Sequence, residues 1–566
     1  MKPQFFDRSA LSRQLWSFRR EFFWVGIFSM IANILMLTPT IYMLQLYGRV
    51  MKSASELTLL MVTIFLIIFF VAMAFAEWLR SRVLVRAGVC LDDALNSMVF
   101  KASFEAYLKR SRQNVSESFH DLANIRQFLT ANGIIAFFDT PWTPVYIGVI
   151  FFLNPFLGWI SVLFTIIQLA ITWQTHVISV KEIERAAESS TESIQYVQSK
   201  LRNIEPVHAM GMVSNFCNQW MQLHDKSLNK AEESLERQHR QQAFAKFVRY
   251  TMQSLTLGAG AMMVIKGEMH VGSMIAANVL MSKALQPLDL VVASWKPFVQ
   301  ATAAFRRLET LLDEFPERHA GARHQDPIGE VRLESVTARV EGRQNPILDD
   351  VSVVFPAGKI SVVLGPSGSG KSTLARCIVG IWPDRKGKVL LDTEPVESWN
   401  REELGPHLGY LPQDVELFDG TIAENIARFA ELDSAKVIEA ASATGIHEMI
   451  LHFPKGYDTG IGEAGSILSG GQRQRLGLAR AIYGQPAVLV LDEPNANLDD
   501  AGERSLLTAL NTLRQSGKTV ILITHRPSVL AVADILVTLE AGKIVHCGPR
   551  DEVLATLRSL SKGNVA

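Results

Sequence analysis

Apolar residues are concentrated in the first half of the chain, in stretches long enough to form membrane-spanning helices. Residues 22–46 and 57–79 each exceed the roughly 20 residues that a helix needs to cross a bilayer. A third apolar region, residues 133–173, is about twice that length, and Asn154-Pro155 interrupts it near its middle. These regions predict four spans, of which the third and fourth are joined by a tight turn.

Two weaker apolar stretches follow, at residues 250–265 and 271–298, and they complete a predicted bundle of six helices over residues 21–314. The long polar connections between spans, residues 79–132 and 174–249, have an amphipathic helical pattern. We therefore expect the membrane helices to extend well beyond the bilayer.

Basic residues orient this bundle. Both long connections are rich in lysine and arginine, whereas the turn at Asn154-Pro155 carries no charge. The segment before the first span also contains Arg13, Arg19 and Arg20. By the positive-inside rule, residues 1–20 and both connections are cytoplasmic. Arg49 and Lys52, on the opposite side, weaken this bias without reversing it.

The pattern changes after Phe315-Pro316. Residues 315–330 are polar, contain proline and glycine, and are typical of a linker. In residues 331–566, short β-branched segments such as "KISVVLG", "AVLVLDE" and "TVILITH" alternate with helical patterns that begin at Ser372 and after Asp499. This alternation predicts a soluble α/β domain with a parallel sheet covered by helices.

Composition narrows the possible functions. A chain of 566 residues exceeds the size of one hydrophobic core, so at least two domains are expected. Its 56 basic and 56 acidic residues balance, which argues against a nucleic-acid partner. The cysteines lack the spacing of a metal site or a disulfide framework, and we expect reduced, mostly buried thiols. They are Cys90, Cys217, Cys377 and Cys547.

A phosphate-binding loop is predicted at "GPSGSGKST", between the first strand of the α/β pattern and a helix. Backbone N–H groups of such a loop cradle phosphates, Lys371 can reach the β and γ oxygens, and Ser372 can hold Mg²⁺. The predicted binding residues are Gly365, Pro366, Ser367, Gly368, Ser369, Gly370, Lys371, Ser372 and Thr373.

Two adjacent carboxylates end the predicted strand "AVLVLDEP". Asp492 is suited to the Mg²⁺ shell, and Glu493 to polarising an attacking water. Such a pair is usually only a strand terminus, but the phosphate loop upstream favours a catalytic role.

A glycine-rich segment precedes a regular helical pattern within residues 456–482. Its glycines have no side chains to pack in a core, but they let the backbone come close to another group. A helix N-terminus attracts anions, so the segment predicts an anion-binding position at the start of this helix.

Five motifs in this order resemble an ABC-type ATPase, and the six spans before them resemble an ABC exporter half-transporter. The motifs are the phosphate loop, "YLPQD", "LSGGQRQR", "LVLDEP" and "ITHRP". The resemblance covers essentially the whole chain and implies a membrane α-helical bundle fused to an α/β P-loop ABC nucleotide-binding domain. It also implies a homodimer in which Ser469, Gly470 and Gly471 contact the γ-phosphate of ATP held by the second copy.

The same resemblance implies roles for single residues. Gln413 is expected to bind Mg²⁺, sense the γ-phosphate and pass that state to the membrane helices. His525 is expected to contact the γ-phosphate and hold the catalytic geometry. Asp499 occupies the position of an acid that touches the opposite subunit, and Glu463, in "GIGEAG", is a candidate for coupling to the cytoplasmic helix ends.

One position departs from the family's pattern. Family members commonly carry an aromatic residue upstream of the phosphate loop that stacks on adenine, where this chain has Val340. Stacking of a base on an aromatic side chain is worth about 1–3 kcal/mol. We therefore expect adenine to be held weakly or by another residue, which leaves the selectivity for ATP over GTP open.

Within the ABC exporters, "LGYLPQDVELFDGTIAENIARF", "EPNANLD" and "LTPTIYMLQLYGRVM" most resemble type I secretion permease-ATPases of the PrtD type. This implies ATP-driven, Mg²⁺-dependent export of polypeptides with a C-terminal signal, through a multi-pass protein of the bacterial inner membrane whose nucleotide-binding domain is cytoplasmic. The implied partners are a second copy, membrane lipid, a periplasmic adaptor protein, a TolC-like outer-membrane channel and the secreted polypeptide.

Only about 20 residues precede the first span, so neither an N-terminal peptidase domain nor leader cleavage is expected. The alternative function is a homodimeric exporter of lipids or drugs, with an apolar lateral cavity and no outer partners.

Ionisable residues within the membrane half are candidates for a transport path. Asp139 lies near the start of the third span, but "DTPW" also predicts a helix start with Thr140 as cap and Pro141 at the first position, and we favour that structural role. Asp289 and Lys296 are seven residues apart, hence on one helical face, and could line a wet path or pair with neighbours.

Overall fold

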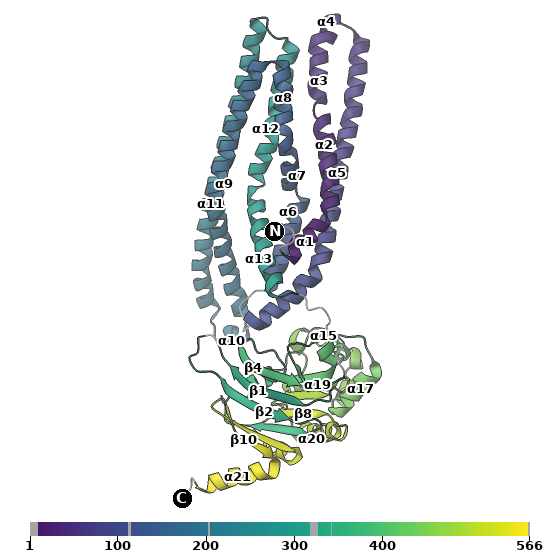
Figure 1. Cartoon of the computed structure of the whole chain (residues 1–566), viewed down its shortest axis with the longest axis vertical. Helices are drawn as coiled ribbons and strands as arrows, with labels where there is room; N and C mark the ends of the chain where they lie inside the picture. The colour runs from purple at the N-terminus through teal and green to yellow at the C-terminus, as the bar shows by residue number, and fades with distance from the viewer. Residues whose placement is uncertain (1–8, 111–114, 202–203, 317–325, 341, 564–566) are drawn as a thin grey trace. The chain divides into compact units, whose positions relative to one another are not determined.

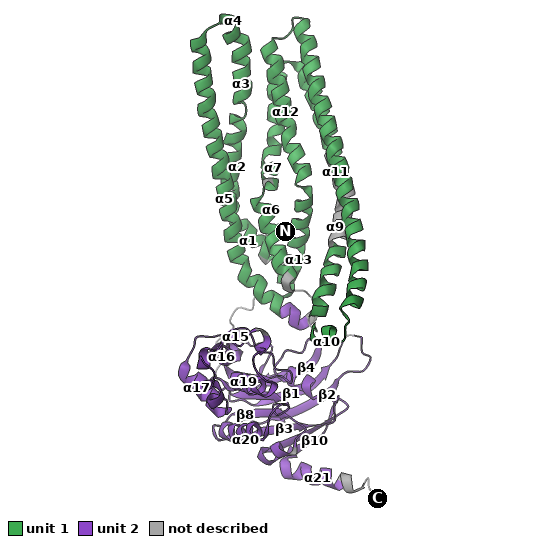
Figure 2. Ribbon diagram, turned by 180° about the vertical axis from the view of Figure 1, so that it is seen from behind, with its two compact units in different colours: residues 1–104, 113–317 green, residues 105–112, 318–566 purple. Residues whose placement is uncertain are grey.

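The computed structural model divides the chain into two compact units (Figure 2). Unit 1 comprises residues 1–104 and 113–317, and unit 2 comprises residues 105–112 and 318–566. The structure describes residues 9–110, 115–201, 204–316, 326–340 and 342–563. The division near residue 317 falls within the expected linker, of which residues 317–325 lie outside the described part.

The described residues between 9 and 316 are mostly helical (Figure 1). The α-helices are α1 (Ala10–Ser17), α2 (Arg19–Leu35), α3 (Thr38–Gln45), α4 (Met51–Ser53), α5 (Glu56–Arg110), α6 (Val115–Thr130), α7 (Asn132–Asp139), α8 (Thr143–Leu153), α9 (Pro155–Leu201), α10 (Ile204–Ala209), α11 (Val213–Ile265), α12 (Val271–Ala293) and α13 (Trp295–Glu314). The 55-residue helix α5 is far longer than a bilayer is thick, as the amphipathic connections predict.

By length and composition, 4 helices of the described chain could cross a membrane, and they coincide with the first, second, third and last expected spans. They are Arg19–Ser53, Glu56–Lys109, Gly133–Leu153 and Val271–Ala293. The fourth expected span begins at Pro155 as a shorter apolar helix, and the fifth is the apolar end of α11. The chain is therefore a multi-pass membrane protein, and the number of six spans stays a prediction.

The core of the bundle lies where α8, α9, α11 and α12 meet, around Tyr146, Leu157, Met252 and Leu280. Half of the apolar window of α12 is buried, against 6% of that of α5. Small residues of α12 are fully buried, and they allow neighbouring helices to approach closely. Helix α12 is therefore central, whereas α5 exposes most of its apolar surface.

Unit 2 contains two sheets. The six-stranded sheet has the order β10 (Lys543–Pro549), β9 (Ile535–Glu540), β3 (Ile360–Leu364), β8 (Thr519–Ile523), β7 (Val488–Asp492) and β6 (Leu408–Leu411). All its pairs are parallel except β10 with β9. The predicted parallel sheet is confirmed, and the inner strands β7 and β8 are buried along their whole length, as their unbroken apolar runs indicate.

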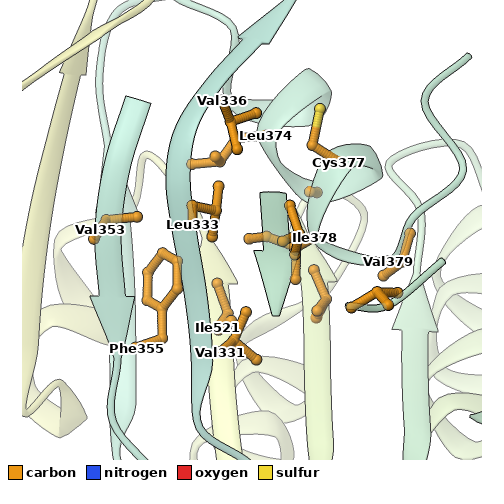
Figure 3. Packing of buried hydrophobic residues seen from close by; sticks show 14 of the residues in the cluster. Val331, Leu333, Val336, Val353, Phe355, Leu374, Cys377, Ile378, Val379 and Ile521 are labelled. Carbon is orange, nitrogen blue, oxygen red and sulfur yellow. The ribbon is translucent and has the colours of Figure 1, made fainter. Parts of the chain in front are cut away.

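The second sheet is antiparallel and was not predicted. It has the order β2 (Leu348–Phe355), β1 (Val331–Ala338), β4 (Arg385–Leu391) and β5 (Glu394–Pro395). Alternating buried and exposed residues in β1 and β2 carried a period-2 signal that the helix–strand alternation obscured. This sheet packs against α14 (Lys371–Ile378) through Leu333, Leu374 and Cys377 (Figure 3).

The expectation of mostly buried cysteines is wrong. Cys377 is buried, but Cys90, Cys217 and Cys547 are exposed. Two of the exposed thiols lie on α5 and α11, long helices whose outer faces are open.

Candidate functional site

The phosphate loop connects strand β3 to helix α14, at the carboxyl end of the parallel strands. Gly368 and Gly370 have φ of +80° and +104°, a backbone conformation that side chains disfavour. At Gly365, a Cβ atom would lie 2.2 Å from the carbonyl oxygen of Leu539. The glycines are thus required by the path of the loop, which leaves its N–H groups available for an anion.

Lys371 begins α14 and lies under the loop. Its ammonium donates to the carbonyl oxygens of Gly365 and Pro366, at 3.0 and 2.9 Å. Burial lowers the pKa of Lys371, and the carboxylates of Glu493 and Asp492 oppose this shift. The cation is therefore held between the loop and two acids, where it can reach phosphate oxygens.

Ser372, Gln413 and Asp492 form an oxygen-rich group beside the loop. The Ser372 hydroxyl lies 3.5 Å from Gln413 Oε1, and Asp492, at the end of β7, is 1% exposed. The Oδ1 atom of Asp492 is buried without a hydrogen-bond partner among the described residues. Hard oxygen ligands and an unpaired buried carboxylate oxygen fit Mg²⁺ shared with substrate phosphates. The described residues contain no cluster of three His, Cys, Asp or Glu side chains suited to a metal on their own.

The environment of Asp492 predicts that Asp492→Asn raises the stability of the ligand-free protein and weakens Mg²⁺ binding. Burial raises the pKa of Asp492; the Ser372 hydroxyl opposes this, and Glu493 adds to it. Because the folded-state pKa is raised, the ligand-free protein gains stability as pH falls through that pKa. Asp492→Asn imitates the protonated form at every pH. We expect the variant to be more stable than wild type at pH 7 without nucleotide, with a difference that shrinks on acidification.

The measurement is the midpoint of thermal unfolding of the detergent-solubilised chain between about pH 5 and 8, with and without Mg²⁺ and ATP. Wild type should be stabilised by Mg²⁺-ATP and Asp492→Asn much less. Equal stabilisation of both would contradict the assignment of Asp492 to the metal.

Glu493 and His525 are in direct contact, with 3.1 Å between Glu493 Oε1 and His525 Nε2. They follow adjacent parallel strands, β7 and β8, and the Glu493 amide donates to the carbonyl oxygen of Ile523. Glu493 has φ of +49°, which turns the chain sharply after the strand. The imidazole can thus hold the carboxylate in place for a water next to the γ-phosphate.

Sequence reasoning missed two buried polar residues behind this pair. Gln474 donates from Nε2 to the Glu493 carbonyl oxygen at 3.2 Å, and Asn495 Oδ1 accepts from the Thr524 hydroxyl at 3.2 Å. Both side chains are 2% exposed. Gln474 projects from the buried face of a helix, where a polar residue needs a partner, and that signal could have identified it.

Ser469, Gly470 and Gly471 open helix α19 (Gly470–Ile482). Ser469 is the N-cap: its hydroxyl accepts from the Gln472 amide while the Gln472 side chain accepts from the Ser469 amide. At Gly471, a Cβ atom would lie 2.7 Å from the Asn497 carbonyl oxygen. The helix start is thus pre-formed, and Ser469 is exposed.

The structure brings together the phosphate loop, Gln413, Asp492, Glu493 and His525, whereas α19 belongs to the layer of α16 (Ile422–Ile426) and α17 (Ser434–Ala443). Among the described residues, Ser469–Gly471 form no hydrogen bond or ion pair with the phosphate loop, and their contact with a second copy stays a prediction.

The remaining predicted positions lie at the edges of this site. Asp499 caps α20 (Asp500–Gln515) by accepting from the Gly502 amide at 2.9 Å. Val340 follows β1 and is 42% exposed, and the weak binding of adenine expected at this position stays a prediction. Glu463 begins a short 3-10 segment, and its side chain lies outside the described part.

Comparisons with known proteins agree with this geometry. Two family models match the chain: "ABC transporter" at residues 348–496 and "ABC transporter transmembrane region" at residues 22–288. The type I secretion system ATP-binding protein PrsD of Rhizobium meliloti is 38% identical over 538 residues, which cover 95% of this chain and 92% of that protein. The chain belongs to the ABC transporter family. The chain is therefore an ATPase transporter, and its phosphate loop lies within the matched residues 348–496.

More distant relatives extend the comparison. The leukotoxin translocation ATP-binding protein LktB of Mannheimia haemolytica is 26% identical over 96% of this transporter and 77% of its own length. The toxin RTX-I translocation ATP-binding protein of Actinobacillus pleuropneumoniae is also 26% identical, over 95% and 77%. A solved bacterial Atm1-family ABC exporter with ATP bound has a TM-score of 0.82 at 22% identity, covering 95% of this chain and 96% of that one. That likeness confirms the predicted exporter fold.

Asp139 of the transporter has polar partners on two other helices. Its carboxylate accepts from Arg80 at 3.0 Å and from the Asn33 amide at 2.7 Å. Tyr146 donates in turn to Asn33 Oδ1 at 2.8 Å. The expected helix start is wrong in detail: the span begins at Asn132, and Thr140 donates to the Ala136 carbonyl oxygen instead of capping. "DTPW" is a 3-10 link between α7 and α8.

The expectation that Asp289 and Lys296 share a helical face is wrong. Helix α12 ends before Ser294, so Lys296 belongs to α13. Asp289 pairs with neighbours: Gln168 donates to it at 2.8 Å, and Arg249 forms an ion pair with it. Pro297 lies in the first turn of α13, where its missing N–H is tolerated, whereas it would break a helix that continued from α12 through Ser294.

Proposed function

We propose that this transporter exports polypeptides carrying a C-terminal signal across the bacterial inner membrane, as the ATPase of a type I secretion system. The observation that carries the proposal is the 38% identity to a type I secretion ATP-binding protein over 92% of that protein's length. The toxin and leukotoxin translocation proteins support the same substrate class. The proposal includes a periplasmic adaptor and a TolC-like outer-membrane channel as partners.

The mechanism follows from the site. Loop amides and Lys371 bind the β- and γ-phosphates of ATP, with Ser372, Gln413 and Asp492 placed to hold Mg²⁺. When bound, Mg²⁺ neutralises charge on the phosphate oxygens. Glu493 orients and polarises the attacking water while His525 keeps the carboxylate in place. Gln413 reports the γ-phosphate to the membrane helices.

A second copy completes each ATP site in this proposal. The exposed, pre-capped start of α19 has backbone N–H groups for an anion but contacts no phosphate loop within the described chain. ATP held between two copies would close the dimer, and hydrolysis would release it. This cycle supplies the conformational change that moves the polypeptide.

The proposal is tested by secretion of a reporter fused to an RTX-type C-terminal segment, in cells that express this chain, an adaptor and an outer-membrane channel. We expect the reporter in the medium without a periplasmic pool, and none with the Glu493→Gln variant. If instead no reporter is released and purified wild type shows ATPase stimulation by lipids or drugs, the chain is a small-molecule exporter.

A further inference from the structure

A basic pocket lies at the start of the first membrane-spanning helix. It has a volume of about 490 Å³ and is formed by the end of α1 and the first turn of α2. We call it the arginine pocket; its lining residues are Arg13, Trp16, Ser17, Arg19, Arg20 and Glu21. Helix α1 packs against α2 and α13, so the pocket is built on a fixed corner of the bundle (Figure 1).

The charges of the arginine pocket are not balanced. Arg13, Arg19 and Arg20 are exposed, and none of them forms an ion pair with any described residue. Glu21 is the one acid among the lining residues, and Asp313 on α13 interacts electrostatically with Arg13. Arg19 and Arg20 therefore carry unneutralised charge at the mouth of the pocket, which favours an anionic ligand.

The aromatic residues around the pocket place it at the level of a bilayer surface. One turn into α2, Phe23 and Trp24 are 66% and 53% exposed. On α5, Trp78 is 52% exposed and the Arg82 guanidinium lies 5.3 Å from its ring centroid. Tryptophan and arginine gather where a membrane helix meets the headgroups.

The two helices share this level. Val25 of α2 and Leu84 of α5 belong to one buried cluster, and Phe22 of α2 packs against it. The Trp–Arg pair of α5 therefore lies at about the same level along the bundle as the pocket. A second such pair is in the pocket itself, where the Arg19 guanidinium lies 5.9 Å from the centroid of Trp16. The exposed aromatic residues of α2 therefore continue from the pocket along the apolar helix, as expected of residues in the bilayer. The arginines of the pocket lie at the level expected for lipid headgroups.

We propose that the arginine pocket binds the phosphate of an anionic phospholipid of the cytoplasmic leaflet. Arg19 and Arg20 would contact the phosphate oxygens, with Arg13 closing the pocket from α1. Trp16 would cover the glycerol region, and acyl chains would run along the exposed aromatic residues of α2. Binding would hold α1 and the first turn of α2 at the membrane surface. Polybasic segments beside membrane helices are attracted to the anionic lipids of the cytoplasmic leaflet.

The test measures association of spin-labelled phosphatidylglycerol with the purified full-length chain in phosphatidylcholine vesicles. The variant is Arg13→Gln/Arg19→Gln/Arg20→Gln, with spin-labelled phosphatidylcholine as the reference lipid. The matched control is Arg332→Gln/Arg343→Gln/Arg558→Gln, which removes the same charge from unit 2. We expect wild type and control to select phosphatidylglycerol and the pocket variant to lose this selectivity at least about fivefold.

Equal selectivity in all three proteins would overturn the proposal. Displacement of the lipid by millimolar inorganic phosphate would also overturn it, because the pocket would then be a general anion site. If the triple variant does not fold, Arg19→Gln/Arg20→Gln gives the same comparison, since both side chains are exposed on the first turn of α2.

Discussion

The Glu493→Gln variant should bind ATP like wild type and hydrolyse it at least about 100-fold more slowly. Glutamine has nearly the shape of glutamate and can still face His525, which lies 3.1 Å from the carboxylate. It cannot polarise or accept a proton from the attacking water, so the loss falls on the chemical step. The left-handed backbone at residue 493 is kept by the substitution, which spares the local fold.

The measurement is phosphate release by the purified chain, together with equilibrium binding of ATP. Glu448→Gln is a matched control, because Glu448 is an exposed residue of the short helix α18 (His447–Leu451), which packs against α17. Wild-type turnover in Glu493→Gln would remove Glu493 from the catalytic role. Loss of ATP binding in the same variant would instead indicate a structural role.

The buried ion pair of Arg80 and Asp139 predicts the second large effect, which is on stability. Arg80→Met should reduce the free energy of unfolding by about 3–5 kcal/mol, because it leaves the buried Asp139 carboxylate without its cation. The two side chains are 9% and 15% exposed, and the pair joins α5 to the end of α7. Asn33 would still donate to the Asp139 carboxylate. A single neutral amide cannot compensate for the loss of the arginine's positive charge.

A double-variant cycle separates the pair from packing. Arg80→Met/Asp139→Asn should recover most of the lost stability, since replacing both charges of a buried pair is often nearly neutral. Arg332→Met, which breaks an exposed pair with Glu330, should cost at most about 1 kcal/mol. Denaturant titration of the detergent-solubilised chain is carried out on wild type, Arg80→Met, Asp139→Asn, the double variant and Arg332→Met. Additive losses in the double variant would show that Arg80 and Asp139 are not coupled.

Contiguous motifs made much of the site predictable. The phosphate loop needs glycines at Gly365, Gly368 and Gly370 because of backbone conformation and close approach, so its residues are written in one short segment. The end of β7 likewise carries Asp492 and Glu493 together. Long apolar runs identified the membrane half, because burial in lipid requires about 20 apolar residues in succession.

Contacts between distant segments were not predictable from one sequence. The support of Glu493 by Gln474, and of Asp139 by Arg80 and Asn33, depends on which helix faces pack together. The same holds for the antiparallel sheet, whose strands pair across separate parts of the domain. The local pattern also predicted one helix through Ser294, where the structure has the end of α12 and the start of α13. The apolar periodicity continues across this break, so it gave no sign of it.

The sequence alone determined a multi-pass membrane half, an α/β nucleotide-binding half and the position of the phosphate loop between a strand and a helix, because each depends on local composition or on a short motif. Only the tertiary structure decided which carboxylates have partners. It paired Asp139 and Asp289 with arginines, left Asp492 Oδ1 buried without a hydrogen-bond partner, and left Arg19 and Arg20 outside any ion pair among the described residues. The physical reason is that the cost of a charge depends on the groups around it, and distant parts of the chain bring those groups together.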